Sequence, residues 1–288
     1  MQATIAICTY NKVGGIGAAV RCAAAQDISD FEVLVVDDGS HRGADVKHTA
    51  QLSGARYVRQ PHGGLNAARN TAMESARSDL VTFIDDDVEV PVGWIRAFVE
   101  GAFRHPRAGV FGGPVLLRVE GQRPRMCERE GFVDTHLDPL PEGPTDAILG
   151  GNMLVRRDAY EETGPFDDRL SGPNDESEWV RRVRSAGFEI VHLPDAWVWH
   201  VRTEHDFKLP HLLRKSFRYG RASALADRIM GEPVAPGAVL ASIPRYVAHA
   251  AKERCWAGLF MATRSAGFAT GALQRSRPVE HSAQHPLQ

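Results

Sequence analysis

The chain has 288 residues, of which 43% are apolar and 24% charged, and its 34 basic residues nearly balance its 36 acidic ones. This length and composition predict one large globular domain, or one domain with an appendage. Glycine and proline usage is ordinary and no repeat occurs at a fixed period, which excludes collagen-like, solenoid and wholly disordered proteins.

The first hundred residues alternate short β-branched apolar runs with segments of helical length, a pattern typical of βα units that build a mostly parallel sheet. We expect strands at Thr4–Cys8, Glu32–Val36, Arg56–Arg59 and Leu80–Ile84. We expect helices at about 14–26, 44–53, 65–77 and 92–104. The predicted fold class is therefore α/β.

The second half of the chain is less regular. Its expected strands are Val110–Arg118, Met153–Val155, Glu189–His192 and Trp197–Trp199. Its expected helices are Ser177–Ser185, Leu209–Ile229 and a further helical stretch from Val239 to Leu273. Residues 278–288 are polar and are expected to be disordered.

The cysteines show neither a CxxC pair nor the spacing of zinc ligands, which favours a reduced, cytoplasmic protein. The N-terminus lacks a charged and then apolar leader, so secretion is not expected. The most membrane-like stretch, residues 255–273, contains Arg264 and three glycines and predicts a poor spanning helix.

Polar side chains gather where three of the predicted strands end. The clusters are Thr9-Tyr10-Asn11, Asp37-Asp38-Gly39-Ser40 and Asp85-Asp86-Asp87. Ligands of an open parallel sheet bind beyond the carboxyl ends of its strands, so we expect these clusters to share one cleft.

The three consecutive aspartates are the most informative cluster. Their carboxylates repel one another, and a hard divalent cation, Mg²⁺ or Mn²⁺, would compensate that repulsion. Asp85 and Asp87 are two residues apart and can face the same side of an extended segment. The alternative is a solvated acidic turn that caps the helix starting near Pro91.

Two further segments fit a nucleotide ligand. An aspartate of the Asp37-Asp38 pair can accept a hydrogen bond from a nucleobase imide or a ribose hydroxyl, although Asp-Gly-Ser is also ordinary turn chemistry. Residues 62–70 place glycines before a helix and Arg69 within its first two turns, a geometry that can bind a diphosphate. A simple turn before the helix is the alternative.

In this order the clusters closely resemble the family 2 glycosyltransferases of GT-A fold. The resemblance continues through Gly150-Gly151-Asn152, Gly164-Pro165-Phe166-Asp167, residues 175–187 and His200. It implies a GT-A catalytic domain over residues 1–206, with a mostly parallel, Rossmann-like sheet flanked by helices. A basic helical extension over residues 207–277 and the tail at 278–288 would follow.

The resemblance also implies roles for individual residues. Those of the donor-nucleotide site are Thr9, Tyr10, Asp37, Asp38, Arg69, Asp85 and Asp86. The metal, Mn²⁺ or Mg²⁺, would be held by the DxD pair Asp85 and Asp87, with His200 as a further ligand or else a structural histidine at a strand end. Gly151, Asn152 and Glu178 would belong to the acceptor region.

The sequence departs from the family at the catalytic base. The family commonly has Glu-Asp-x-Asp before an arginine-rich helix, and this chain has Asp175-Glu176-Ser177-Glu178. Glu176 takes the position of the base, and Asp175 serves instead if the loop shifts by one residue. Acids before Trp179 can also simply cap the helix.

The implied reaction is an inverting, metal-dependent transfer of a sugar from a nucleotide-diphosphate donor to an acceptor hydroxyl of a glycan, a lipid-linked molecule or a small metabolite. The alternative is a catalytically degenerate nucleotide-sugar-binding scaffold, for which the unusual Asp-Glu order is the main support. A dinucleotide-dependent oxidoreductase is disfavoured, because Gly14-Gly15-Ile16-Gly17 does not match G-x-G-x-x-G.

Charge is divided unevenly along the chain. Residues 207–277 contain 12 lysines and arginines but three acids, so this arm carries +9 and the remainder −11. Arg214, Lys215, Arg218 and Arg221 recur at helical spacing. Such a helix either contacts anionic lipid at the inner face of a membrane or packs over the acidic body as a lid. Nucleic acid is not an expected partner, because the cleft is acidic.

Overall fold

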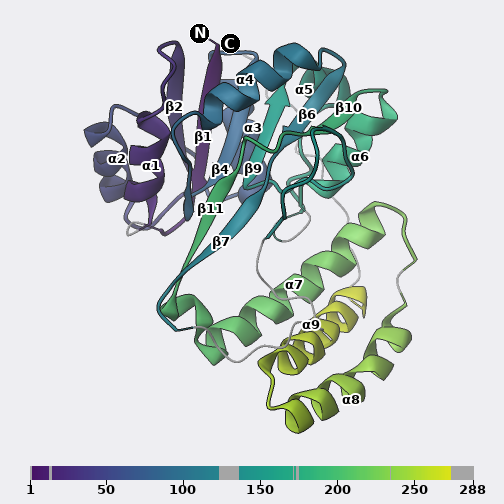
Figure 1. The fold of residues 1–288 in the computed structure, drawn as a ribbon. Helices are drawn as coiled ribbons and strands as arrows, with labels where there is room; N and C mark the ends of the chain where they lie inside the picture. The colour runs from purple at the N-terminus through teal and green to yellow at the C-terminus, as the bar shows by residue number, and fades with distance from the viewer. Residues whose placement is uncertain are drawn as a thin grey trace.

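The computed structural model describes residues 2–12, 15–122, 136–170, 172, 175–233 and 235–273. Its main sheet has eight strands in the order β3-β2-β1-β4-β9-β6-β10-β8 (Figure 1). They are β1 (Ala3–Thr9), β2 (Phe31–Asp37), β3 (Arg56–Arg59), β4 (Leu80–Asp85), β6 (Ala108–Gly112), β8 (Gly143–Pro144), β9 (Asn152–Arg156) and β10 (Glu189–His192). The first four pair in parallel, as predicted, while β9 runs antiparallel to both of its neighbours.

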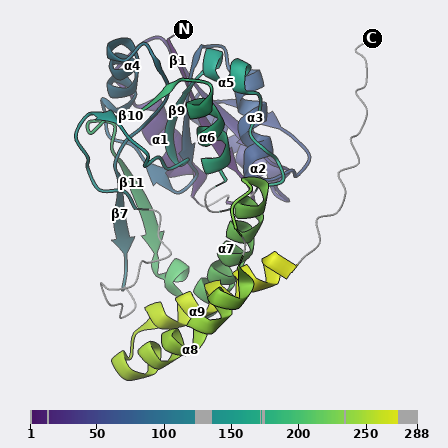
Figure 2. The ribbon, with the colours of Figure 1, turned by 90° about the vertical axis from the view of Figure 1, so that its right-hand side faces the viewer.

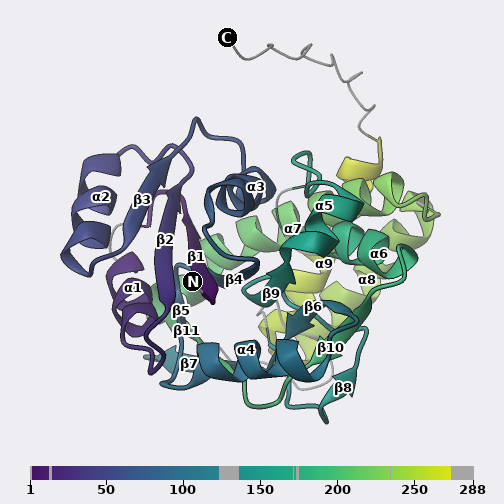
Figure 3. The ribbon, with the colours of Figure 1, turned by 90° about the horizontal axis from the view of Figure 1, so that it is seen from above.

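Helices cover both faces of this sheet. The helices are α1 (Ile16–Ala24), α2 (Gly43–Leu52), α3 (Leu65–Ser75), α4 (Trp94–Arg104), α5 (Arg157–Thr163) and α6 (Ser177–Ser185). Seen from above, α1 and α4 lie on one side and α3, α5 and α6 on the other (Figure 3). Ile5 and Ile7 of β1 belong to the first core, and Ala6 and Cys8 to the second. Burial on both faces explains why these strands are continuously apolar.

A second sheet of three short strands lies beside the first. It consists of β5 (Val88–Glu89), β11 (Val198–Thr203) and β7 (Val115–Glu120). The prediction of one strand over Val110–Arg118 is therefore wrong. The chain leaves β6 at Gly112, passes through Gly113 and Pro114, and enters the other sheet. Pro114 cannot donate to a ladder, and a Cβ on Gly113 would lie 2.1 Å from the carbonyl oxygen of Ala196.

The C-terminal arm forms a separate layer below the carboxyl ends of the strands (Figure 2). It comprises the 3₁₀ turn η1 (Glu204–Phe207), α7 (Leu209–Ile229), α8 (Pro236–Glu253) and α9 (Trp256–Leu273). The helical stretch from Val239 to Leu273 is broken at Arg254, whose φ is 48°. Within the described residues, none of the helices is long and apolar enough to cross a membrane. The predicted tail, residues 278–288, lies outside the described residues.

Glycines let the backbones of α7 and α9 approach closely. A Cβ on Gly220 would lie 1.9 Å from the carbonyl oxygen of Arg264, and one on Gly267 would lie 2.1 Å from that of Phe217. Because both obstacles are backbone atoms, a side chain at either position forces the helices apart. Ser216 and Ala224 flank Gly220 at four-residue spacing and are buried, so small residues line this contact.

Gly220→Ala is expected to lower the free energy of unfolding by about 1 to 3 kcal/mol, the usual cost of overpacking. Gly237→Ala in α8 is the matched control, since a Cβ there meets nothing within 4 Å and alanine favours helix. Urea unfolding of both variants measures the difference. Equal stability of the two would contradict the close contact between α7 and α9.

Candidate functional site

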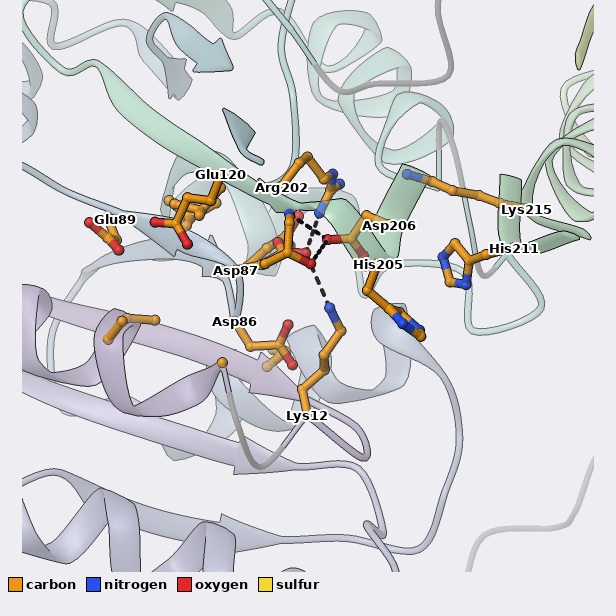
Figure 4. Close-up of a pocket in the computed structure, with 18 of the residues that line it drawn as sticks. Lys12, Asp86, Asp87, Glu89, Glu120, Arg202, His205, Asp206, His211 and Lys215 are labelled. Atoms are coloured by element: carbon orange, nitrogen blue, oxygen red, sulfur yellow. Dashed lines mark hydrogen bonds and ion pairs between the residues drawn. The ribbon is translucent and has the colours of Figure 1, made fainter. Parts of the chain in front are cut away.

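The predicted clusters lie together at the carboxyl ends of β1, β2 and β4. Cys8 of β1 pairs with Asp85 of β4, so Thr9 and the aspartate run emerge side by side. A cavity of about 790 Å³ opens at this edge (Figure 4). Its charged lining comes from the N-terminal loop, the aspartate run, β5, β7, β11, η1 and α7: Lys12, Asp85, Asp86, Asp87, Glu89, Glu120, Arg202, His205, Asp206, His211 and Lys215.

Asp87 is held from three sides. Its Oδ1 lies 3.2 Å from Nε2 of His200, while its Oδ2 accepts from Nη1 of Arg202 and lies 3.5 Å from Nζ of Lys12. Burial alone would raise the pKa of Asp87, but the bond from His200 and the charges of Arg202 and Lys12 outweigh it and lower that pKa. Asp87 is therefore the carboxylate of the run that stays ionised most readily.

The pKa values of Asp85 and Asp86 are shifted in the opposite direction from that of Asp87. Burial and the charge of Asp87 raise the pKa of Asp85. The same two causes raise the pKa of Asp86 to about 7, although Thr9 opposes them by donating from Oγ1 to Asp86 Oδ2 at 2.6 Å. Carboxylates with opposing pKa shifts thus lie side by side here, and a bound cation would favour the ionised form of each.

Asp85, Asp87 and His200 can each offer a ligand atom such that all three atoms lie within 4.8 Å of one another. The two carboxylates suit Mn²⁺ or Mg²⁺, and the imidazole of His200 could add a nitrogen ligand. The two sheets together build this set, because Asp85 ends β4 and His200 lies on β11. Asp86, the middle aspartate, points its Oδ2 toward Thr9 and does not join the set.

Asp37 and Asp38 shape the loops at the end of β2. Asp37 is fully buried and accepts from the Ser40 amide at 2.8 Å and from the Tyr57 hydroxyl at 2.6 Å. Asp38 accepts from the amides of Gly63 and Gly64, from Gln60 and from His62, each at 2.8 Å. These bonds tie the end of β2 to the glycine loop before α3.

A pair of stacked rings lies on top of that loop. The rings of Tyr10 and His62 are 4.0 Å apart at centroid with an interplanar angle of 13°. Tyr10 is 38% exposed, and the side chain of His62 is 53% exposed. A flat, accessible ring surface beside the strand ends suits stacking against a nucleobase.

The base candidates lie beside the buried Arg69, whose charge also interacts with Asp85. Nη1 of Arg69 donates to Asp175 Oδ1 at 2.7 Å, and both side chains are almost completely buried. Burial is the largest cause and the charge of Asp175 the second that raise the pKa of the adjacent Glu176 to about 8. Arg69 therefore holds Asp175 as an ion pair and leaves Glu176 as the carboxyl group that titrates near neutral pH.

This titration predicts a pH-dependent difference in stability. The ordinary pKa of Glu176 is 4.5 and its folded value about 8, so between these values the unfolded chain binds fewer protons and stability falls as pH rises. In chelator, Glu176→Gln is expected to gain stability over wild type from about pH 5 to about pH 8, by a few kcal/mol at about 1.4 kcal/mol per pKa unit. Urea unfolding at several pH values measures it; a constant difference would contradict it.

The predicted acceptor residues occupy three different places. Gly151 lies against the metal set, where a Cβ would be 2.6 Å from Asp85 Oδ2. Asn152 is fully buried and its amide bonds to Trp94, Pro114 and Ala196, so it joins structural elements. Glu178 pairs with Arg182 at 2.7 Å and lines a separate hollow of about 370 Å³.

Lys12 and Arg202 were missed by the sequence reasoning, although both contact Asp87. Arg202 follows His200 by two residues, and in a strand that spacing places both on one face. The predicted strand ended at Trp199, so the alternation of its side chains did not extend to Arg202. Two histidines and a lysine, His205, His211 and Lys215, face the same cavity from η1 and α7 (Figure 4).

The chain is similar to known glycosyltransferases in sequence and in structure. The chain is 28% identical over 239 residues to a pre-mycofactocin glycosyltransferase of Mycobacterium tuberculosis, which covers 78% of this chain and 47% of that protein. The chain thus spans about half the length of that curated relative. The structure of GalNAc-T7 with UDP, GalNAc and Mn²⁺ aligns with a TM-score of 0.57 at 15% identity, covering 75% of this chain and 47% of the other.

The Staphylococcus aureus TarS fragment 1–349 in complex with UDP aligns over 94% of this chain and 90% of its own, with a TM-score of 0.54 and 16% identity. These likenesses show a GT-A fold, with a mostly parallel sheet flanked by helices and a C-terminal helical extension. The sequence model of glycosyl transferase family 2 matches residues 4–164, more than half of the chain. The protein belongs to glycosyl transferase family 2.

Proposed function

We propose that the protein is a metal-dependent, inverting glycosyltransferase that moves a sugar from a nucleotide-diphosphate donor to an acceptor hydroxyl. One observation carries the proposal: Asp85 of the metal set Asp85, Asp87 and His200 and the base candidates Asp175 and Glu176 all act electrostatically on the buried Arg69, which donates to Asp175. Residues 1–206 would supply these groups and residues 207–277 would complete the cavity.

Asp85, Asp87 and His200 would hold Mn²⁺ or Mg²⁺. A divalent cation in this place neutralises charge on a leaving diphosphate, Lewis-acid work worth several kcal/mol in the transition state. On the nucleotide side, the Tyr10–His62 stack would face the base, with Thr9, Asp37 and Asp38 fixing the loops around it.

Glu176 would take the proton of the acceptor hydroxyl as its oxygen attacks the anomeric carbon. The bond from that carbon to the diphosphate oxygen breaks on the opposite face, and its electron pair passes to the diphosphate. Attack and departure on opposite faces invert the anomeric centre. A pKa of about 8 suits Glu176 to this work, since a general base is most effective when its pKa lies near the working pH.

A screen of UDP-, GDP- and dTDP-sugars tests the proposal. We expect one donor class to raise the melting temperature more in the presence of Mn²⁺ than with chelator, and to release its nucleoside diphosphate when acceptors are added. Donor binding without turnover over a broad acceptor panel would instead identify a nucleotide-sugar-binding scaffold. Binding of none of these donors would contradict both functions.

We further propose that the arm contacts an anionic membrane through α8. The first helix of the arm, α7, lines the cavity with Lys215 and Tyr219, as a lid would, and α8 is the layer farthest from the sheet (Figure 2). None of the residues of α8 is fully buried. Leu240 and Val247 are 45% and 48% exposed and two helical turns apart.

The charge of α8 also suits a membrane surface. Arg245 and Lys252 are exposed, and Glu253 at the C-terminal end is the single acid of the helix. Apolar side chains beside cations are typical of helices that lie in the interface of anionic bilayers. Phosphatidylglycerol is therefore a suitable test lipid.

Wild type is expected to sediment with phosphatidylglycerol vesicles at low salt, and the double variant Leu240→Ser, Val247→Ser to lose most of that binding. Leu52→Ser is the control, because Leu52 of α2 is 75% exposed far from the arm. Wild-type protein that stays in the supernatant would remove the membrane contact and leave the lid as the role of the arm.

A further inference from the structure

Two cations of the chain itself are bound to Asp87, the acid at the centre of the proposed metal site. Arg202 Nη1 donates to Asp87 Oδ2, and Lys12 Nζ lies 3.5 Å from the same oxygen (Figure 4). The Arg202 side chain is 8% exposed, whereas that of Lys12 is 48% exposed. One carboxylate oxygen thus faces both a buried cation and a half-exposed one.

These two cations and a divalent metal ion would compete for Asp87. A carboxylate that ligates a metal ion gives electron density to it, and the ion then places two further positive charges beside Arg202 and Lys12. Like charges a few ångströms apart repel strongly in a partly buried site. Asp206 is the next acid of the cavity, but Thr203 already engages its carboxylate, through its amide at 2.9 Å and its hydroxyl at 3.0 Å.

The charge balance of the site changes when a diphosphate enters with the metal ion. Asp85, Asp86, Asp87 and Asp206 offer at most four negative charges, which Lys12, Arg202 and a divalent ion would balance. A nucleoside diphosphate brings further negative charge and presents oxygens that both a metal ion and a guanidinium bind well. Arg202 and Lys12 both line the cavity in which such oxygens would bind.

We propose that Lys12 and Arg202 are counter-cations of Asp87 that transfer to the diphosphate of the donor when a metal ion ligates Asp87, so that metal and diphosphate bind cooperatively. The inference rests on the proposed function and adds two diphosphate-binding residues to it. In the transfer reaction they would stabilise the oxygen that receives the electron pair of the broken bond.

The proposal predicts opposite effects of one substitution on two ligands. Arg202→Met removes a competitor of the metal ion, so Mn²⁺ alone should bind as tightly as in wild type or up to about tenfold more tightly. The same variant should bind UDP in the presence of Mn²⁺ about tenfold or more weakly, because the diphosphate loses a charge-assisted partner. The coupling between Mn²⁺ and UDP is reciprocal, so a titration of either ligand in the presence of the other measures it.

The experiment titrates Mn²⁺ by its electron paramagnetic resonance signal, with and without saturating UDP, and repeats the series with uridine, which has no phosphate. Wild type, Arg202→Met and Lys12→Met are compared, with Arg181→Met as control, because Arg181 pairs with Glu232 away from the cavity. Arg202→Gln, which removes the charge but keeps a polar side chain, serves if Arg202→Met fails to fold. We expect coupling with UDP but not with uridine, and reduced coupling in the Lys12 and Arg202 variants alone.

If folded Lys12 and Arg202 variants showed the same coupling between Mn²⁺ and UDP as wild type, the inference would be overturned. Binding of Mn²⁺ and UDP by wild type would in that case still support the proposed function. Weaker binding of Mn²⁺ alone by Arg202→Met would also overturn it, since Arg202 would then support the metal site rather than compete there. A wild-type protein that bound neither Mn²⁺ nor a nucleoside diphosphate would remove the proposed function and this inference together.

Discussion

Asp87→Asn is expected to lower metal-dependent sugar transfer by about a thousandfold. The amide keeps the shape of the side chain but removes the charge that a divalent ion needs, and several kcal/mol of transition-state stabilisation correspond to roughly this factor. The measurement is the transfer rate at saturating Mn²⁺ with the donor that the screen identifies, together with the Mn²⁺ affinity.

The control is Asp138→Asn, since the Asp138 side chain is 81% exposed and pairs with His136 outside the cavity. Circular dichroism and urea unfolding of Asp87→Asn show whether the fold survives, because Arg202 and His200 lose an ionised partner. Full activity in folded Asp87→Asn would show that the aspartate run has another role, such as capping the turn before α4.

Glu176→Gln is expected to lower kcat by about 10²- to 10⁴-fold, the usual contribution of a general base, while donor affinity stays unchanged. Wild-type kcat/KM should rise with pH until the pH passes about 8, the pKa of Glu176, and the residual rate of Glu176→Gln should lose this dependence. Steady-state kinetics over the pH range, with UDP affinity measured in parallel, test both effects.

Asp175→Asn separates the two base candidates. It leaves the buried Arg69 without its ionised partner, and breaking such a pair costs about 3 to 5 kcal/mol of stability. Activity lost with stability would fit a structural Asp175, whereas a stable Asp175→Asn protein with a larger kcat loss than Glu176→Gln would move the base to Asp175.

The sequence predicted the part of the fold that local patterns encode. The βα units of the first hundred residues have the expected order, because continuous apolar runs identify strands buried on both faces. The break between β6 and β7 was missed since Val110–Arg118 is apolar throughout apart from its glycines, its proline and its last residue. The change of sheet depends on Ala196, which approaches Gly113 from more than 80 residues away.

The same limit applies to the site. The polar residues at the strand ends correctly predicted that Thr9, Asp85 and Asp87 lie close together, because the sheet topology places the ends of β1 and β4 side by side. The Arg69–Asp175 pair joins residues 106 positions apart, and nothing in their local sequence specifies it. The full engagement of Asp38 by the glycine loop likewise depends on where that loop folds back.

The division of the metal set between two sheets bears on the order in which the site forms. His200 and Asp87 are 113 positions apart, and the Val201 amide bonds to the Asp87 carbonyl at 2.9 Å. During synthesis the aspartate run therefore emerges long before its partners on β11, and loop-closure entropy makes such non-local contacts slow to form. The strands β1 to β4 can therefore pair before β11 has been synthesised, whereas the Asp85–Asp87–His200 set can form only after it.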